Sequence, residues 1–158
     1  MKENIINEAK RVLDLELQAI EAQKTVIDDN FVKAIELLDS CESKVIITGM
    51  GKSGLIGRKI SSTLSSTGTP SLFIHPAESA HGDLGVIQKG DVVIAISNSG
   101  ESKEMAPMLN YLKRKGIKLI GMTSKKGSSL DKMSDISLVF NITKDCLLYT
   151  SPSPRDRG

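Results

Sequence analysis

Two short stretches rich in glycine and serine carry the chemistry that this chain could perform. Residues 49–54 read Gly-Met-Gly-Lys-Ser-Gly, and residues 97–102 read Ser-Asn-Ser-Gly-Glu-Ser. Each stretch follows an apolar run and precedes a segment with helical periodicity, so each should form the turn between a strand and a helix. Such a turn offers backbone N–H groups at the positive end of a helix dipole, which binds anions and above all phosphate. Two such turns on one sheet could hold a phosphorylated small molecule between them.

The first stretch also matches two nucleotide-binding motifs, and both fit poorly. Its Gly-x-Gly-x-x-Gly pattern is a dinucleotide fingerprint, but the first acidic residue after the next strand is Glu78, beyond a proline and too late to hold a ribose. Its Gly-Lys-Ser run imitates the phosphate-binding loop of nucleotide hydrolases, which requires a glycine where this chain has Ile46. A plain tight turn is the structural alternative for 49–54, and a polar helix cap is the alternative for 97–102.

Acid–base groups lie close to both stretches in the sequence. Glu104 is expected on the first turn of the helix after 97–102, where it is either a partner for the helix dipole or a general base beside a bound sugar. Residues 75–83 hold both histidines of the chain and follow the second predicted strand. Histidine side chains ordinarily titrate near neutral pH, so His81 is a candidate for a proton relay. His75 is a candidate metal ligand, although its spacing from His81 is not typical of a zinc site.

The hydrophobic pattern predicts a scaffold that brings these residues together. Strands that are apolar throughout and alternate with helices indicate a parallel sheet covered on both faces. The expected fold class is therefore α/β, a three-layer α/β/α sandwich with a five-stranded parallel sheet and an N-terminal helical extension. Ligands of such sheets bind beyond the carboxyl ends of the strands, where both stretches lie. The predicted strands are 44–48, 71–75, 91–96, 117–122 and 136–141, and the predicted helices are 2–27, 31–41 (after a cap at 28–30), 52–67, 101–115 and 128–133.

Length and composition exclude several classes of protein. The 158 residues, 39% hydrophobic and 25% charged, suffice for one domain with a core. A net charge of +2 and 3% aromatic residues without Trp give no reason to expect a nucleic-acid partner. No apolar run approaches the roughly 20 residues of a membrane span, and the charged N-terminus does not resemble a secretory signal. The two cysteines lack metal-ligand spacing and form no disulfide framework. These features predict a cytoplasmic protein without a membrane partner.

The pattern divides the chain into three regions. N-terminal helices occupy 1–43, the sheet domain occupies 44–145, and a tail occupies 146–158. The tail breaks every preceding pattern and resembles the translated reading frame of a sequencing adaptor, with a natural linker rich in proline and serine as the alternative. We therefore expect a non-native tail, exposed and poorly ordered, after a domain that is truncated near residue 145.

Together the motifs resemble those of the sugar isomerase (SIS) domain family. The resemblance covers about residues 1–145 and, within that family, is closest to the D-arabinose 5-phosphate isomerases. It implies a Rossmann-like SIS domain. The motifs that carry it are the strand–turn–helix at 49–54, Gly-Thr-Pro-Ser at 68–71, His-Pro-Ala-Glu-Ser-Ala-His-Gly-Asp at 75–83 and Ile-Ser-Asn-Ser-Gly-Glu-Ser at 96–102.

The resemblance implies a reaction and a set of residues. The reaction is the reversible conversion of D-ribulose 5-phosphate to D-arabinose 5-phosphate through an enediol, for Kdo synthesis in lipopolysaccharide or capsule. Glu104 would carry the proton, Lys52 would stabilise charge on the enediolate oxygens, and His81 would help to open the sugar ring. Asp145 matches a further catalytic position, where the family usually has the longer Glu. The implied substrate contacts are Gly51, Ser53, Gly68, Thr69, Ser97, Asn98, Ser99, Gly100 and Ser102.

The resemblance also implies cofactors and partners. No cofactor would be required, and His75 matches a zinc position where the metal is inhibitory or structural. SIS domains pack as dimers or tetramers, so we expect a homodimer or homotetramer, with residues 2–27 as an interface helix or packed on their own sheet. The family continues with a further helix, a catalytic histidine and usually two CBS modules.

Two alternative functions stay open at this point. A non-catalytic SIS regulator would bind a sugar phosphate and need an N-terminal helix-turn-helix, whereas residues 1–41 predict one long and one short helix. An isomerase for another phosphosugar, a phosphohexulose, phosphoheptose or glucosamine 6-phosphate, is the second alternative.

Overall fold

The structure is a computed structural model that describes residues 2–79 and 83–141 of the chain. The described residues divide into two compact units, one formed by residues 28–139 and the other by residues 2–27 together with 140 and 141. His81, Asp145 and the predicted tail at 146–158 lie outside the described residues.

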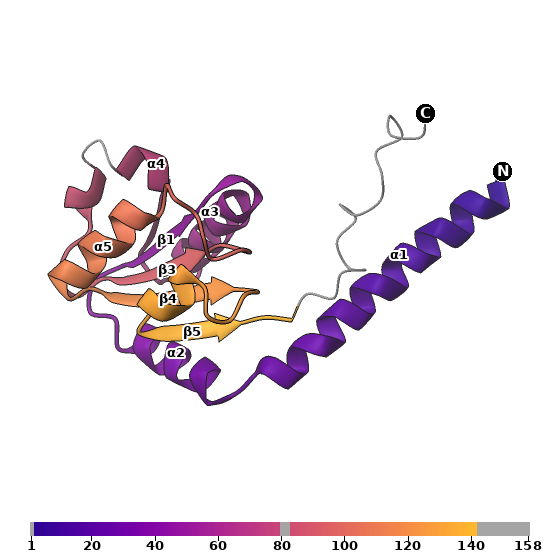
Figure 1. Cartoon of the computed structure of the whole chain (residues 1–158), viewed down its shortest axis with the longest axis horizontal. Coiled ribbons are helices and arrows are strands. Elements are labelled where there is room, and N and C mark those ends of the chain that lie inside the picture. The colour runs from indigo at the N-terminus through magenta and orange to yellow at the C-terminus, as the bar shows by residue number, and fades with distance from the viewer. Residues whose placement is uncertain (1, 80–82, 142–158) are drawn as a thin grey trace. The chain divides into compact units, whose positions relative to one another are not determined.

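The larger unit contains one sheet of five parallel strands in the order β2-β1-β3-β4-β5 (Figure 1). The fold class predicted from the sequence is confirmed. β1 and β3 are buried at every position, which explains why their sequences are apolar without alternation. The strands are β1 (Val45–Gly49), β2 (Ser71–Ile74), β3 (Val92–Ile96), β4 (Lys118–Thr123) and β5 (Ile136–Val139).

Helices cover both faces of the sheet and produce two separate cores. On one face, Ile46, Val93 and Ala95 pack with residues of α5 (Ala106–Lys115) and α6 (Ser129–Met133). On the other face, the alternate residues of β1 and β3 pack with α2 (Asp29–Asp39) and α3 (Gly51–Ser66). Figure 1 shows α2 and α5 on opposite sides of the strands. The arrangement is the predicted three-layer sandwich, and α2 packs with the sheet rather than apart from it.

Helix boundaries differ from the prediction at α5. The expected helix at 101–115 begins only at Ala106, and Glu104 therefore lies in a turn that precedes the helix. Pro107 explains the difference, because proline has no N–H to donate and is tolerated in the first turn of a helix but not in its interior. α2 begins as predicted after its cap, since the Asp28 carboxylate accepts hydrogen bonds from the N–H groups of Asn30 (2.8 Å) and Phe31 (3.3 Å).

Two further short elements were not predicted from the sequence. The segment after β2 forms α4 (Pro76–Ser79) and a 3-10 turn, η2 (Asp83–Val86). Each spans four residues, too few to show a helical period in the sequence.

The smaller unit contains α1 (Lys2–Gln23), which continues into a 3-10 turn, η1 (Lys24–Val26). Its apolar stripe is largely exposed, with Ile5, Leu13, Leu17 and Ile20 at 60–67% exposure. Within the smaller unit, the Gln23 side chain donates a hydrogen bond of 2.6 Å to the backbone oxygen of Asn141. Among the described residues, no helix is both long enough and apolar enough to cross a membrane.

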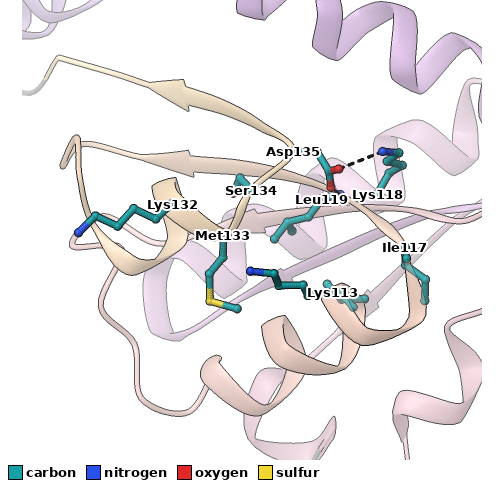
Figure 2. A pocket seen from close by; sticks show the side chains of 10 residues that line it. Lys113, Ile117, Lys118, Leu119, Lys132, Met133, Ser134 and Asp135 are labelled. Carbon is teal, nitrogen blue, oxygen red and sulfur yellow. Dashed lines mark hydrogen bonds and ion pairs between the residues drawn. The ribbon is translucent and has the colours of Figure 1, made fainter.

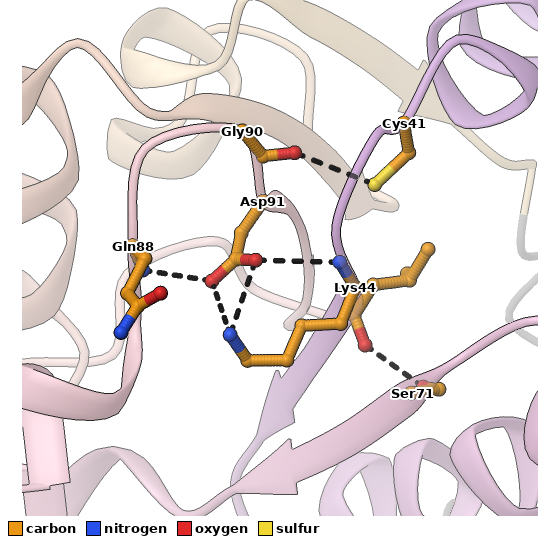
Figure 3. A network of polar contacts seen from close by, with 7 residues as sticks. Cys41, Lys44, Ser71, Gln88, Gly90 and Asp91 are labelled. Atoms are coloured by element: carbon orange, nitrogen blue, oxygen red, sulfur yellow. Dashed lines mark hydrogen bonds and ion pairs between the residues drawn. The ribbon is translucent and has the colours of Figure 1, made fainter.

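A buried carboxylate holds the amino-terminal edge of the sheet together (Figure 3). Asp91 has a side chain that is 0% exposed and accepts from the Lys44 ammonium at 2.9 Å and 3.2 Å. The N–H groups of Gln88 (2.7 Å) and Lys44 (3.3 Å) also donate to it. Burial on its own would raise the pKa of Asp91, but the hydrogen bonds from Gln88, Ser43 and Lys44 outweigh burial and hold that pKa below its ordinary value. The network ties the start of β1 to the start of β3.

Candidate functional site

The strand register places both predicted loops at the same edge of the sheet. β1 and β3 are neighbours, and Gly49 at the end of β1 pairs with Ile96 at the end of β3. The loops that leave these strands therefore start side by side. The order β2-β1-β3-β4-β5 also makes β1 and β3 the strands between which the chain changes direction across the sheet. Open α/β sheets bind their ligands at such a switch point.

Glycines let the first loop and the start of α3 lie against the strand ends. A Cβ on Gly54 would come within 2.7 Å of the Gly49 carbonyl oxygen, and a Cβ on Gly49 would come within 3.1 Å of the Ile96 oxygen. Gly51 begins α3 with φ +53°, in the left-handed region that glycine adopts readily. Met50 supplies no side-chain cap to the helix. Lys52 and Ser53 lie on its first turn at the carboxyl edge, where a bound anion would meet the helix terminus.

Serine hydroxyls shape the second loop from within. The Ser97 hydroxyl is buried and accepts a hydrogen bond from the Gly100 N–H at 3.1 Å, and the Ser99 hydroxyl accepts from the Glu101 N–H at 3.3 Å. Asn98 and Ser99 are exposed at the tip. The loop thus keeps a fixed backbone shape while it presents an amide and a hydroxyl outward.

The second loop is also fixed to the end of β4. The Asn98 carbonyl oxygen accepts hydrogen bonds from the Thr123 hydroxyl (3.1 Å), the Ser124 N–H (3.1 Å) and the Ser124 hydroxyl (2.9 Å). Gly100 has φ +66°, and a Cβ there would lie 2.1 Å from the Ser128 hydroxyl oxygen. Position 100 therefore requires glycine for two independent reasons, backbone conformation and space.

Glu104 is exposed in the turn between the second loop and α5. Its own backbone N–H and the Ser102 hydroxyl, which donates at 3.0 Å, hold the pKa of the Glu104 carboxyl below its ordinary value. The group is therefore ionised at neutral pH and able to accept a proton. This hydrogen bond brings Ser102 and Glu104 together at the end of the second loop.

His75 reaches the same edge from the neighbouring strand. It follows β2, whose last residue Ile74 pairs with Thr48 of β1. His75 lines a cavity of about 260 Å³ with Arg58, Phe73 and Glu78, in which the Arg58 guanidinium lies 4.4 Å from the centre of the Phe73 ring. The buried Nδ1 atom of His75 has no hydrogen-bond partner among the described residues.

The cavity beside His75 does not provide the ligand set of a metal site. Zinc sites in proteins use three or four nitrogen, sulfur or oxygen ligands. Within 2–79 and 83–141, no group of three or more histidine, cysteine, aspartate and glutamate side chains is placed to hold a metal. The described part of the chain therefore does not fit zinc at His75.

Comparison with known proteins agrees with this geometry. A family model described as the SIS domain matches residues 38–151, more than half of the chain. The chain belongs to the SIS domain family.

Individual relatives are similar over most of this SIS chain. It is 46% identical over 156 residues to the arabinose 5-phosphate isomerase KdsD of Pseudomonas aeruginosa, covering 97% of this chain and 48% of that protein. It is 45% identical over 152 residues to the KdsD of Francisella tularensis, covering 94% and 46%. The chain spans about half the length of the curated relatives that it matches. Among solved structures, an Escherichia coli CFT073 protein in complex with arabinose 5-phosphate superposes with a TM-score of 0.85 at 42% identity, covering 90% of this chain and 76% of that one.

The structure does not bring Gly68 and Thr69 to the predicted site. Both residues follow α3 and precede β2, and in a parallel sheet the helix returns the chain to the amino-terminal edge before the next strand starts. They lie at the opposite edge from the loops after β1 and β3. Within this chain they are therefore not beside those loops, and their role as substrate contacts stays a prediction from the family resemblance.

The other predicted residues lie at the carboxyl edge of the sheet, except for His81 and Asp145. The structure places there, on the loops and helix starts after β1, β2 and β3, the residues Gly51, Lys52, Ser53, His75, Ser97, Asn98, Ser99, Gly100, Ser102 and Glu104. His81 and Asp145 cannot be placed, because they fall outside the described residues. Sequence reasoning missed Thr123, Ser124 and Ser128, which support the second loop from the end of β4 and the start of α6. Their only signal was a third cluster of serine and threonine after an apolar strand.

A cavity of about 240 Å³ lies away from all of these residues (Figure 2). It is lined by the end of α5, the start of β4 and the end of α6, and the Lys118 ammonium is paired with Asp135 at 3.0 Å on its wall. Lys113 and Lys132 also line it. Since the strands β4 and β5 start here, the cavity belongs to the amino-terminal edge. This cavity therefore lies at the opposite edge of the sheet from both loops.

Proposed function

We propose that this chain is the SIS domain of a D-arabinose 5-phosphate isomerase, which interconverts D-ribulose 5-phosphate and D-arabinose 5-phosphate on the route to Kdo. The observation that carries the proposal is the pairing of Gly49 with Ile96, which starts two loops suited to phosphate at one point of the sheet edge. The 46% identity to KdsD and the similarity to a structure that contains arabinose 5-phosphate support this choice of sugar.

In this proposal the two loops bind the phosphate and orient the sugar. The start of α3 and the hydroxyl groups of the second loop donate hydrogen bonds to the phosphate oxygens without adding net charge. Asn98 and Ser99, exposed at the loop tip, face the solvent side from which a ligand would arrive. The proposed contacts at this edge are Gly51, Ser53, Ser97, Asn98, Ser99, Gly100 and Ser102. Gly68 and Thr69 are left out of the single-chain site.

Glu104 is the proposed proton carrier. Its carboxylate removes a proton from C1 of the ketose, and the electrons of that C–H bond form the C1–C2 double bond of the enediol while the carbonyl oxygen O2 takes up negative charge and then a proton. Return of a proton to C2, with loss of the O1 proton, gives the aldose. Lys52 stabilises the charge on the enediolate oxygens from the start of α3. His81 and Asp145 are retained as candidates for ring opening and for auxiliary proton transfer.

The remaining proposals concern cofactors, partners and cell compartment. Proton transfer through an enediol requires a base and a stabilised oxyanion, both of which this chain supplies, so we propose that no cofactor is needed. Zinc at His75 is not included, because the described residues do not make up its ligand set. The exposed apolar stripe of α1 suits an interface in a homodimer or homotetramer. We place the protein in the cytoplasm.

Steady-state kinetics test the proposal. The chain is supplied with D-ribulose 5-phosphate and formation of D-arabinose 5-phosphate is measured, with hexulose, heptose and glucosamine phosphates in parallel. Glu104→Gln should lower kcat about a hundredfold or more with little change in KM, since the base is lost and the binding loops are kept. Glu42→Gln, which neutralises an exposed carboxylate at the opposite edge, is the matched control and should retain the wild-type kcat.

Two results would contradict the assignment. A near-normal kcat in Glu104→Gln would remove Glu104 from the role of proton carrier. Tight binding of sugar phosphates without formation of any aldose would favour the regulator over the enzyme.

A further inference from the structure

Glu101 is the one member of the second loop for which the proposed reaction has no role. Its carboxylate reaches across to the start of α6, 28 residues further along the chain. One carboxylate oxygen accepts a hydrogen bond from the Ser129 N–H at 3.0 Å, and the other accepts from the Ser129 hydroxyl at 2.6 Å. A carboxylate held by two donors of one residue fixes the side chain in direction as well as in distance.

The backbone of the loop is bound to the same helix end. The Gly100 carbonyl oxygen accepts from the Leu130 N–H at 3.0 Å, and the Ser128 hydroxyl caps the Asp131 N–H at 3.3 Å. The first three N–H groups of α6 are therefore satisfied by the protein itself, two of them by the loop. Leu130 is 0% exposed in the core, so the helix end is a fixed platform. Glu101 and Gly100 attach the inner side of the loop to this platform, whereas Asn98 and Ser99 stay exposed.

The negative charge of Glu101 stabilises its contact with α6 at neutral pH. The hydrogen bonds from the Ser129 hydroxyl and N–H, together with nearby Lys125 and Lys132, hold the pKa of the Glu101 carboxyl below its ordinary value. The carboxylate also sits on the N-terminus of α6, where a negative group is favourable. The junction between β4 and α6 thus contains an anion from the protein, whereas α3 has no side-chain cap.

We propose that Glu101 is a positioning residue, which holds the loop 97–102 in the shape that binds the phosphate of the substrate and does not itself touch the substrate. Without the carboxylate, the loop keeps the Gly100 attachment to α6 and the Asn98 attachment to the end of β4, but its last residues, 101 and 102, lose the contact that fixes their direction. Misplacement of binding groups by about 1 Å is enough to weaken binding or catalysis by one to two orders of magnitude. The identity of the ligand as a sugar phosphate rests on the proposed function, whereas the anchoring itself does not.

Four variants test the proposal: Glu101→Ala, Glu101→Gln, Ser129→Ala and Asp131→Ala. Dissociation constants for D-arabinose 5-phosphate and for inorganic phosphate are measured by calorimetry, beside KM, kcat and urea unfolding. Glu101→Ala should raise KM and both dissociation constants about tenfold, with kcat within about twofold of wild type. Glu101→Gln should recover most of the affinity, because its amide oxygen still accepts from the Ser129 N–H and its amide N–H can donate to the hydroxyl.

The other two variants separate positioning from stability. Ser129→Ala keeps the N–H donor and removes only the hydroxyl donor, so it should raise the dissociation constants about threefold, less than Glu101→Ala. Asp131→Ala removes a carboxylate on the same helix that accepts from the Gly127 N–H at 2.6 Å, and it should leave phosphate affinity unchanged.

Three outcomes would overturn the proposal. The first is wild-type phosphate affinity in Glu101→Ala. The second is an equal loss of affinity in Asp131→Ala, because that would be a general effect of loosening α6. The third is no recovery in Glu101→Gln. If Glu101→Ala does not fold, Ser129→Ala provides the test. A threefold higher dissociation constant for phosphate would support anchoring, and a wild-type value would refute it. Failure of the proposed function would appear separately, as a wild-type chain that binds phosphate but forms no aldose.

Discussion

The clearest test of the loop geometry compares two glycines with the same backbone conformation. Gly100 and Gly116 both have φ +66°, so alanine at either position carries the same cost of a left-handed backbone, about 1 to 2 kcal/mol. Their surroundings differ. A Cβ at position 116 meets nothing within 4 Å, whereas a Cβ at position 100 would lie 2.1 Å from the Ser128 oxygen and 2.9 Å from the Thr123 oxygen. Gly116→Ala therefore measures the backbone cost alone, and Gly100→Ala adds the steric cost.

The expected magnitudes follow from what must move. Ser128 cannot move away without a cost in free energy, because it is 0% exposed and its hydroxyl caps α6. Displacing it costs about 1 to 3 kcal/mol of overpacking and about 1 kcal/mol of lost cap. We therefore expect Gly100→Ala to lower the free energy of unfolding by about 3 to 6 kcal/mol, against about 1 to 2 kcal/mol for Gly116→Ala.

Urea unfolding followed by circular dichroism gives both values, and phosphate binding measured on the same samples shows whether the loop has moved. Gly100→Ala should also lose phosphate affinity, whereas Gly116→Ala, at the opposite edge of the sheet, should keep it. Equal destabilisation of the two variants would refute the argument, since it would mean that the loop does not lie on Ser128.

Two further predictions concern stability. Asp91→Asn should lower the free energy of unfolding by about 2 kcal/mol at neutral pH, less than for a fully buried ion pair because Lys44 is 24% exposed. The folded-state pKa of Asp91 is lowered, so its contribution is present above the unfolded pKa and is lost as pH falls through the folded pKa. In urea unfolding, the difference in free energy of unfolding between wild type and Asp91→Asn should be smaller at acid pH than at neutral pH. The same difference at both pH values would contradict this prediction. Asp28→Ala should lower the free energy of unfolding by about 1 kcal/mol and Asp28→Asn by much less, because the cap of α2 needs a hydrogen-bond acceptor and not a charge. Equal thermal midpoints for the two variants would count against this reasoning.

Much of the fold was predictable from the sequence because the sheet is covered on both faces. Short uninterrupted apolar runs such as 92–96, ended by glycine-rich turns, predict buried strands, because they are too short for helices. The start of α5 lies five residues later than predicted, because Pro107 is tolerated only in the first turn of a helix.

The candidate site was predictable where it follows from strand ends and not where it depends on contacts between distant segments. The loops after β1 and β3 were expected together, because parallel strands end at the same edge. The same rule places Gly68 and Thr69 at the other edge of this chain's sheet, and only the family resemblance predicts them as substrate contacts. The Glu101–Ser129 contact joins residues 28 positions apart and has no periodicity that a single sequence could show.

The distance between the Asp91 network and the loops after β1 and β3 has a practical consequence. Asp91 is at the start of the strands and the binding loops are at their end, with the length of the sheet between them. Substitutions that raise the thermal stability of a protein can lower its activity where the stabilised residues are also those that function needs to be flexible. In this domain stability is supported at one end of the sheet and the candidate ligand loops lie at the other, so libraries at residues 41–43 and 88–90 that keep Lys44 and Asp91 should change the thermal midpoint without changing phosphate affinity.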